Sequence, residues 1–148
     1  MALLGIEFND SMLTAYRDRQ LLFAEPGCAA IDAANVVFGI EAQRTAYSRA
    51  VTFYDRYWYA LSEQRLARGA PPFETSADLV FGQLGKLWQA CSAGSTQVAY
   101  AVPVYWSNEQ LALLLGISAE LGIPVTTLVE IPVAATRREY PDSELLHV

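Results

Sequence analysis

The alternation of hydrophobic and polar residues predicts a strand-rich beginning to the chain. Two hydrophobic runs, residues 3–8 and 12–16, are joined through Asn9-Asp10-Ser11, and a third short run covers residues 20–24. Asn and Asp tolerate the left-handed backbone that tight hairpins need. Because parallel pairing would require a much longer connection, these runs predict an antiparallel meander of three strands.

The last half of the chain alternates helix and strand signals. A helix start at 75–78 opens an amphipathic segment that stops at Ala93-Gly94, and a continuous apolar strand follows at 97–102. Ser107 and Gln110 then form a capping box at the head of a second helix, and a second buried strand follows at 125–129. A strand, a helix and a strand in this order predict two parallel strands joined by a right-handed crossover.

The middle of the chain is rich in aromatic residues and carries a weaker pattern. A short strand at 36–39 and a short helix directly after it are expected, and apolar residues spaced by three and four from 52 to 66 predict a second helix. Residues of about 40–75 are therefore a candidate helical insertion on the core. The aromatic cluster at 53–59 fits either core packing or the binding of a ring-shaped ligand or a partner.

Size and charge narrow the class of protein. A chain of 148 residues has the size of one domain, and its formal charge of -6 argues against a nucleic-acid partner. The longest apolar run, LALLLGI at 111–117, is far too short to span a bilayer, and the opening MALLGIEF lacks the features of a secretion signal, so we expect a cytoplasmic protein. Cys28, Cys91 and His147 stand far apart in the sequence, which makes a zinc site unexpected and favours buried thiols.

Residues 98–136 resemble the first lobe of the actin-like ATPases, and most closely that of the seventy-kilodalton heat-shock chaperones. The resemblance rests on Val-Pro-Val-Tyr at 102–105, on the helix cap at 107–110, and on Glu-Ile-Pro-Val-Ala-Ala at 130–135, which holds one extra residue, Ile131. It implies a ribonuclease-H-like α/β fold with a mixed five-stranded sheet in the order 3-2-1-4-5 and flanking helices. Ligands of such sheets gather at the carboxyl ends of the parallel strands.

The same resemblance places GIEFNDSML where the family has its first phosphate loop. By position, Glu7 stands for a catalytic, metal-organising aspartate, Asn9 for a glycine, and Asp10 and Ser11 for a pair of hydroxyl residues that bind the phosphates of the nucleotide. Glu130 corresponds to a glutamate that helps to position magnesium. Only Ser11 keeps the donor chemistry, and Asp10 brings a negative charge toward phosphate.

Each of these positions also has a purely structural interpretation. Asn9-Asp10 fits a hairpin turn selected for its backbone conformation, and Glu7 fits an acid at a strand end. Glu130 fits a residue that ends its strand and caps the next helix. The middle block also lacks the lysine that the chaperones carry near the γ-phosphate, since Lys86 is the single lysine of the chain.

The resemblance further implies that ATP and Mg would be held only together with a second lobe. Residues 1–143 cover one first lobe, and residues 144–148 read like the start of the second. For this chain alone we expect weak or lost nucleotide binding and no ATP hydrolysis. The expected partner is the second lobe or another protein, and an exposed inter-lobe face should favour self-association.

Two other classes of function stay open. Actin-like lobes serve as non-catalytic scaffolds in bacterial pilus and secretion assembly, a use that fits the altered turn. A metal nuclease of the ribonuclease H class would need Glu7, Asp10 and Glu130 to converge around two cations. The charge of -6 and the missing fourth carboxylate argue against the nuclease.

Overall fold

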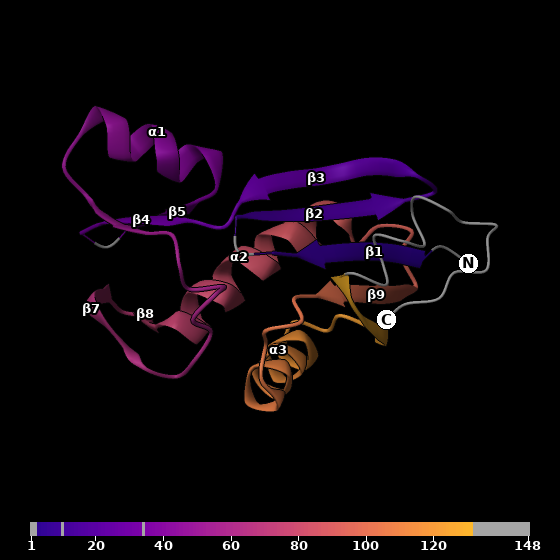
Figure 1. Cartoon of the computed structure of the whole chain (residues 1–148). Helices are drawn as coiled ribbons and strands as arrows, with labels where there is room; N and C mark the ends of the chain where they lie inside the picture. The colour runs from indigo at the N-terminus through magenta and orange to yellow at the C-terminus, as the bar shows by residue number, and fades with distance from the viewer. Residues whose placement is uncertain (1–2, 10, 34, 132–148) are drawn as a thin grey trace.

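A five-stranded mixed sheet forms the centre of the protein (Figure 1), in a computed structural model that describes residues 3–9, 11–33 and 35–131. The strands follow the order β10-β9-β1-β2-β3. They are β1 (Leu3–Phe8), β2 (Met12–Arg17), β3 (Gln20–Pro26), β9 (Gln97–Val102) and β10 (Val125–Glu130). Strands β1, β2 and β3 pair antiparallel, whereas β9 is parallel to both β1 and β10. The predicted ribonuclease-H-like sheet and its strand order are confirmed.

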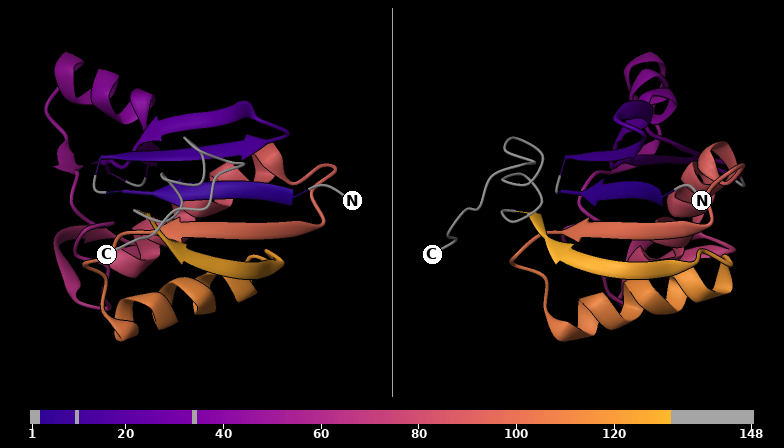
Figure 2. Two further views of the ribbon diagram at one scale, coloured as in Figure 1. Left: turned by 45° about the vertical axis from the view of Figure 1, so that its right-hand side comes forward. Right: turned by 90° about the vertical axis from the view of Figure 1, so that its right-hand side faces the viewer.

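Helices α2 (Ser76–Cys91) and α3 (Asn108–Glu120) pack on the same face of this sheet (Figures 1 and 2). Both begin with a capping box, built by Thr75 with Asp78 in α2 and by Ser107 with Gln110 in α3. Each box satisfies amide groups that a helix start otherwise leaves without partners. The boxes explain why both helices begin where the sequence predicts.

The core lies between the sheet and these two helices. Alternate residues of β1 and β9 point into it, so that Leu4, Ile6 and Phe8 are buried beside Val98, Tyr100 and Val102. The Tyr100 hydroxyl and Ser118 Oγ lie 2.7 Å apart, which ties β9 to α3. Burial raises the pKa of Tyr100 to about 12, so its hydroxyl stays protonated at neutral pH.

A smaller sheet lies beside the main one. It is formed by β4 (Ala29–Asp32), β5 (Asn35–Phe38) and β6 (Thr52–Tyr54) in the order β5-β4-β6, and α1 (Ile40–Ser48) packs against it (Figure 1). Strands β7 (Arg65–Ala70) and β8 (Phe73–Thr75) form a separate pair. The short strand and the short helix predicted for the middle block are confirmed as β5 and α1.

The second helix predicted for the middle block, over residues 52–66, is wrong. The same residues form β6, an irregular turn and the start of β7. Their helix-like spacing arises because Tyr57, Trp58 and Leu61 reach the core from the turn, where all three are buried. Tertiary packing therefore decides the local structure, and the periodicity does not.

A buried glutamine holds this turn against the main domain. Gln83 of α2 has no exposed surface, and its Oε1 accepts hydrogen bonds from the Tyr57 hydroxyl at 2.7 Å and from Trp58 Nε1 at 2.8 Å. Its Nε2 donates to the Pro26 carbonyl at 2.9 Å and to Glu25 Oε1 at 3.2 Å. One side chain thus joins α2, the turn and the end of β3.

Stacked aromatic rings fill the core directly beneath the β1–β2 turn. Trp58 stacks on Phe8 with ring centroids 5.0 Å apart, and it lies nearly parallel to Trp106 at 6.5 Å. Phe8 also meets the edge of Tyr100 at 4.9 Å. For Tyr57 and Trp58, core packing is the correct interpretation of the aromatic cluster, whereas Phe53 and Tyr59 are exposed.

We expect the substitution Gln83→Leu to lower the free energy of unfolding by about 2–4 kcal/mol, because it leaves two buried donors without an acceptor. Urea denaturation followed by tryptophan fluorescence measures this change. The matched control is Gln89→Leu, at an exposed position of the same helix, which should change stability by less than about 0.5 kcal/mol. Equal effects of the two substitutions would contradict the role assigned to Gln83.

Candidate functional site

The turn between β1 and β2 is closed by the side chain of Asn9. Its Oδ1 accepts hydrogen bonds from the Met12 amide at 2.7 Å, the Ser11 amide at 2.9 Å and the Ser11 hydroxyl at 3.0 Å. The Asn9 amide in turn donates to the Met12 carbonyl at 3.2 Å. One carboxamide oxygen thus accepts three donors of the turn.

These three donors are the groups that a phosphate loop would offer to a ligand. Backbone amides and a hydroxyl that converge on one point form an anion site when that point is vacant. Here the Asn9 oxygen occupies that point. The turn therefore satisfies its own hydrogen-bonding groups. Asp10 lies outside the described residues.

Glu7 lies on the face of the sheet opposite α2 and α3. It is half-buried in β1, between Thr14 of β2 and Ala101 of β9, and its neighbours Ile6 and Phe8 point into the core. It lines a shallow hollow of about 180 Å³ on that face, together with the small residues Gly5, Ala99 and Ala101.

Glu130 lies at the end of β10 and is exposed. Its register partner is Val102, a core residue of β9, whereas the partner of Glu7 is Ala101. Because successive residues of a strand face opposite sides of a sheet, Glu7 and Glu130 point to opposite faces. Strand β9 also separates them, so their backbones are about 10 Å apart. The register does not bring these two carboxylates together.

The described residues do not fit a magnesium-bound phosphate at this edge. No group of three or more His, Cys, Asp or Glu side chains with metal-binding geometry occurs within 3–9, 11–33 and 35–131. The Asn9 carboxamide holds the amides of the turn, and the two candidate metal ligands face apart. We therefore derive no catalytic step through a nucleotide or a metal at this site.

Lys86 and the two cysteines are reactive residue types, but their contacts are those of structural residues. Lys86 Nζ lies 2.6 Å from Glu25 Oε2 and also donates to the Phe38 carbonyl, so it joins α2 to β3 and β5. Cys28 and Cys91 are buried free thiols, as predicted. Burial raises the pKa of Cys28 to about 11, which disfavours the nucleophilic thiolate.

The role of the Asn9 side chain was not predicted from the sequence. Asn9 was expected to favour the backbone conformation of the turn, whereas its side-chain oxygen organises the turn. The signal was present, because Asn followed two residues later by Ser is typical of turns in which the side chain accepts amide hydrogen bonds.

In the part of the chain that the structure describes, no helix is long and apolar enough to cross a membrane.

Comparison with known proteins identifies the fold. No protein-family model matches the chain, and no curated protein matches its sequence. Among solved structures, the crystal structure of MreB5 of Spiroplasma citri bound to ADP matches with a TM-score of 0.63 and 13% sequence identity, over 87% of this chain and 38% of that chain. This likeness shows that the chain shares the fold of the matched part of that protein, which is an actin-like fold. The chain thus spans well under half the length of that protein.

We expect Asn9→Ala to lower the free energy of unfolding by about 1 kcal/mol, because water replaces the lost acceptor only in part at this exposed turn. The nearly isosteric Asn9→Asp keeps the accepting oxygen and should stay within about 0.5 kcal/mol of wild type. Chemical denaturation of the three proteins gives both values. A loss of the same size in both variants would show that the accepting oxygen does not hold the turn.

Proposed function

We propose that this chain is an actin-like lobe that works through protein contacts and holds no phosphate at its first hairpin. The observation that carries the proposal is the position of Asn9 Oδ1, which accepts three hydrogen bonds from the donors of the turn. A nucleotide phosphate would have to displace this oxygen from all three donors. The turn is therefore stable without a ligand.

Electrostatics adds to this barrier. Asp10 follows Asn9 directly, and at about 4 Å with an effective dielectric near 20 its repulsion of a phosphate would be on the order of 4 kcal/mol. A cation would have to offset this repulsion. The described carboxylates offer it no shared site, because Glu7 and Glu130 face opposite sides of the sheet.

A non-catalytic, cytoplasmic scaffold is the class of function that fits these features. The described part of the chain builds a complete five-stranded sheet with a closed turn, which supports a module that presents surfaces to partners. Its particular closeness to the seventy-kilodalton chaperones and its self-association through an inter-lobe face remain predictions. Light scattering at increasing protein concentration tests the self-association.

A nucleotide-binding lobe is the second candidate, because the similar MreB5 structure is bound to ADP. In that case a second lobe would supply the remaining contacts to the nucleotide. The two candidates differ in what this chain does alone and in the effect of opening the turn.

Isothermal titration of the chain with Mg-ATP and with Mg-ADP tests whether this lobe holds nucleotide on its own. We expect no saturable binding with a Kd below about 1 mM, which corresponds to roughly 4 kcal/mol. Saturable binding with a Kd below about 100 µM would contradict the proposal. Asn9→Asp keeps the turn closed and serves as the matched control for Asn9→Gly, which opens it.

Asn9→Gly frees the amides of Ser11 and Met12 and the Ser11 hydroxyl. We expect this variant to bind inorganic phosphate more tightly than wild type, and Asn9→Asp to show no such gain. Phosphate binding that is unchanged in Asn9→Gly would show that the Asn9 oxygen is not the group that excludes phosphate. Chemical shifts of the Ser11 and Met12 amides during the titration report binding at the turn itself.

A further inference from the structure

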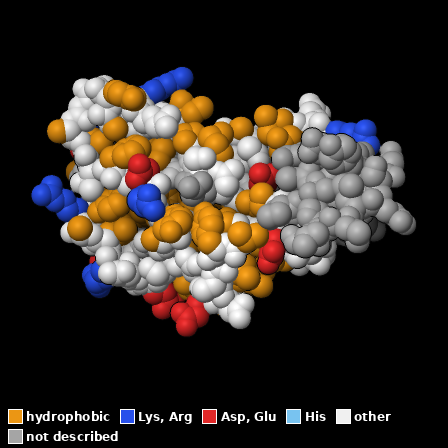
Figure 3. Space-filling view, viewed as in Figure 1, with side chains coloured by type: hydrophobic (Ala, Val, Ile, Leu, Met, Phe, Trp, Pro, Cys, Tyr) orange, Lys and Arg blue, Asp and Glu red, His pale blue; other side chains and the backbone are white. Residues whose placement is uncertain are grey.

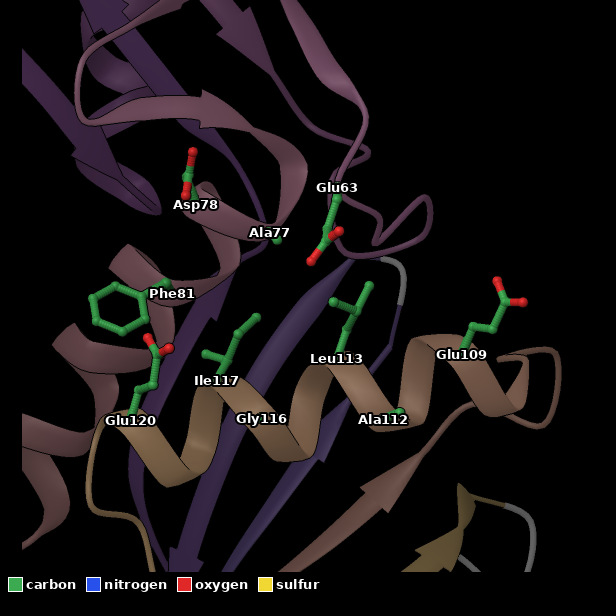
Figure 4. Close-up of a pocket in the computed structure, with 10 residues that line it drawn as sticks. All are labelled: Glu63, Ala77, Asp78, Phe81, Glu109, Ala112, Leu113, Gly116, Ile117 and Glu120. Atoms are coloured by element: carbon green, nitrogen blue, oxygen red, sulfur yellow. The ribbon is translucent and has the colours of Figure 1, made fainter.

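A groove of about 520 Å³ runs between α2 and α3 (Figure 4). One face of α3 forms its floor, with residues at the helical spacing 109, 112, 113, 116, 117 and 120. Phe81 of α2 points into the groove and is 38% exposed, a high value for a phenylalanine beside a core. The groove is thus an apolar surface that the described chain leaves uncovered.

Carboxylates surround this apolar floor. Glu109 and Glu120 stand at the two ends of the α3 face, and Glu63 and Asp78 lie along the other side (Figure 4). Among the residues that the structure describes, no Lys or Arg lines the groove. Figure 3 shows acidic side chains along the lower edge of the molecule, where α3 lies. Within the described residues, Glu63, Glu109 and Glu120 take part in no ion pair.

Two residues of α3 in this groove contradict local helix preferences. Gly116 lies in the middle of the helix, where glycine costs roughly 1 kcal/mol relative to alanine. A Cβ at this position would meet no atom within 4 Å, so packing inside the described chain does not require glycine. Glu120 lies in the last turn, where the helix dipole disfavours a negative charge. Both unfavourable choices face the groove, and a bound partner would account for both.

From these observations we propose that the α2–α3 groove binds a short, basic amphipathic helix of a protein partner. Apolar side chains of that helix pack between Phe81, Leu113 and Ile117, and its backbone approaches α3 closely at Gly116. Lysine or arginine residues at its ends pair with Glu109 and Glu120. This inference rests on the proposed function, for which it names the binding surface and the chemistry of the partner.

The shape of the groove favours a helix as the occupant. The α3 face from Glu109 to Glu120 is about 16 Å long, which matches three helical turns. The groove lies between two helices and offers no free strand edge, so a partner cannot bind by adding a strand. Small residues at 112 and 116 allow the close approach of another helix. The carboxylates would repel anionic lipids and nucleic-acid phosphates, which argues against both as ligands.

The test uses a fluorescein-labelled 18-residue helical peptide made of leucine, alanine and lysine, with leucine on one face. Fluorescence anisotropy at low salt measures its Kd for the full chain, and amide chemical shifts locate its binding surface. A peptide of the same composition with scrambled order is the ligand control. We expect saturable binding below about 1 mM for the amphipathic peptide, with shifts in α2 and α3. No saturable binding, or shifts confined to another surface, would overturn the proposal.

Two matched double variants distinguish binding at the groove from a nonspecific effect of the protein's net negative charge. Glu109→Gln with Glu120→Gln should weaken peptide binding about 5-fold, because two rim charge pairs are lost. Glu41→Gln with Asp18→Asn changes the net charge equally at positions outside the groove and should change the Kd less than about 2-fold. Equal losses in both double variants would show that the peptide responds only to total charge.

Gly116 gives a steric test with an internal control. Gly116→Leu fills the groove and should abolish peptide binding, and Gly116→Ala should weaken it to a smaller extent, because its methyl group lies where the partner backbone approaches. Gly116→Ala should also raise the Tm of the free protein by about 2–4 °C, since alanine favours the helix. Retained binding in a folded Gly116→Leu variant would overturn the proposal. Because nucleotide is absent from these measurements, their failure leaves the titrations with Mg-ATP to decide the proposed function separately.

Discussion

The side chain of Gln83 is the contact on which the arrangement of this protein depends. A fully buried carboxamide is stable only when its hydrogen-bonding groups are satisfied, and here four partners from two segments, the turn and the end of β3, satisfy them. Through Trp58, this network fixes the stacked rings beneath Phe8, the residue directly before the β1–β2 turn. Glu25 in turn pairs with Lys86, and its carboxylate lies against Gly39, which connects the smaller sheet to α1. The position of the turn and the attachment of the smaller sheet therefore have a common physical origin in α2.

The main sheet and its two helices could be predicted from the sequence because local signals and tertiary structure agree there. Capping boxes at Thr75 and Ser107 set both helix starts, and the short connections of the first three strands allow only antiparallel pairing. The middle block could not be predicted in the same way. Its aromatic residues are spaced like one face of a helix, but Tyr57 and Trp58 are held by a glutamine 25 or more positions away. No local pattern contains such a long-range partner, and β4, β7 and β8 were missed for the same reason: short strands have weak periodicity and depend on their neighbours.

The elements that carry the candidate residues could be predicted from the sequence, and the directions of their side chains could not. As expected, Glu7 lies in β1, Asn9 and Ser11 lie in the turn after it, and Glu130 ends β10. A ligand site formed by these residues stays a prediction. What the sequence could not give is the direction of side chains. A shift of one residue in register decides whether two carboxylates share a face, and Glu7 and Glu130 pair with successive residues of β9. The direction of the Asn9 side chain depends in turn on three donors that converge only once the hairpin has formed.

The β1–β2 turn and the α2–α3 groove differ in how well their residues suit the local backbone structure. This difference bears on which of the two carries the function. In an actin-like fold a ligand is expected at the turn. Here the Ser11 amide, the Ser11 hydroxyl and the Met12 amide all donate to Asn9 instead. In the α2–α3 groove, where the fold raises no such expectation, a mid-helix glycine has no packing reason and an acid stands at the wrong end of a helix. Proteins retain locally unfavourable residues chiefly where function compensates for their cost. The agreement at the turn and the conflict in the groove therefore both support the proposal that this lobe works through protein contacts on its helices and not through a nucleotide at the edge of the sheet.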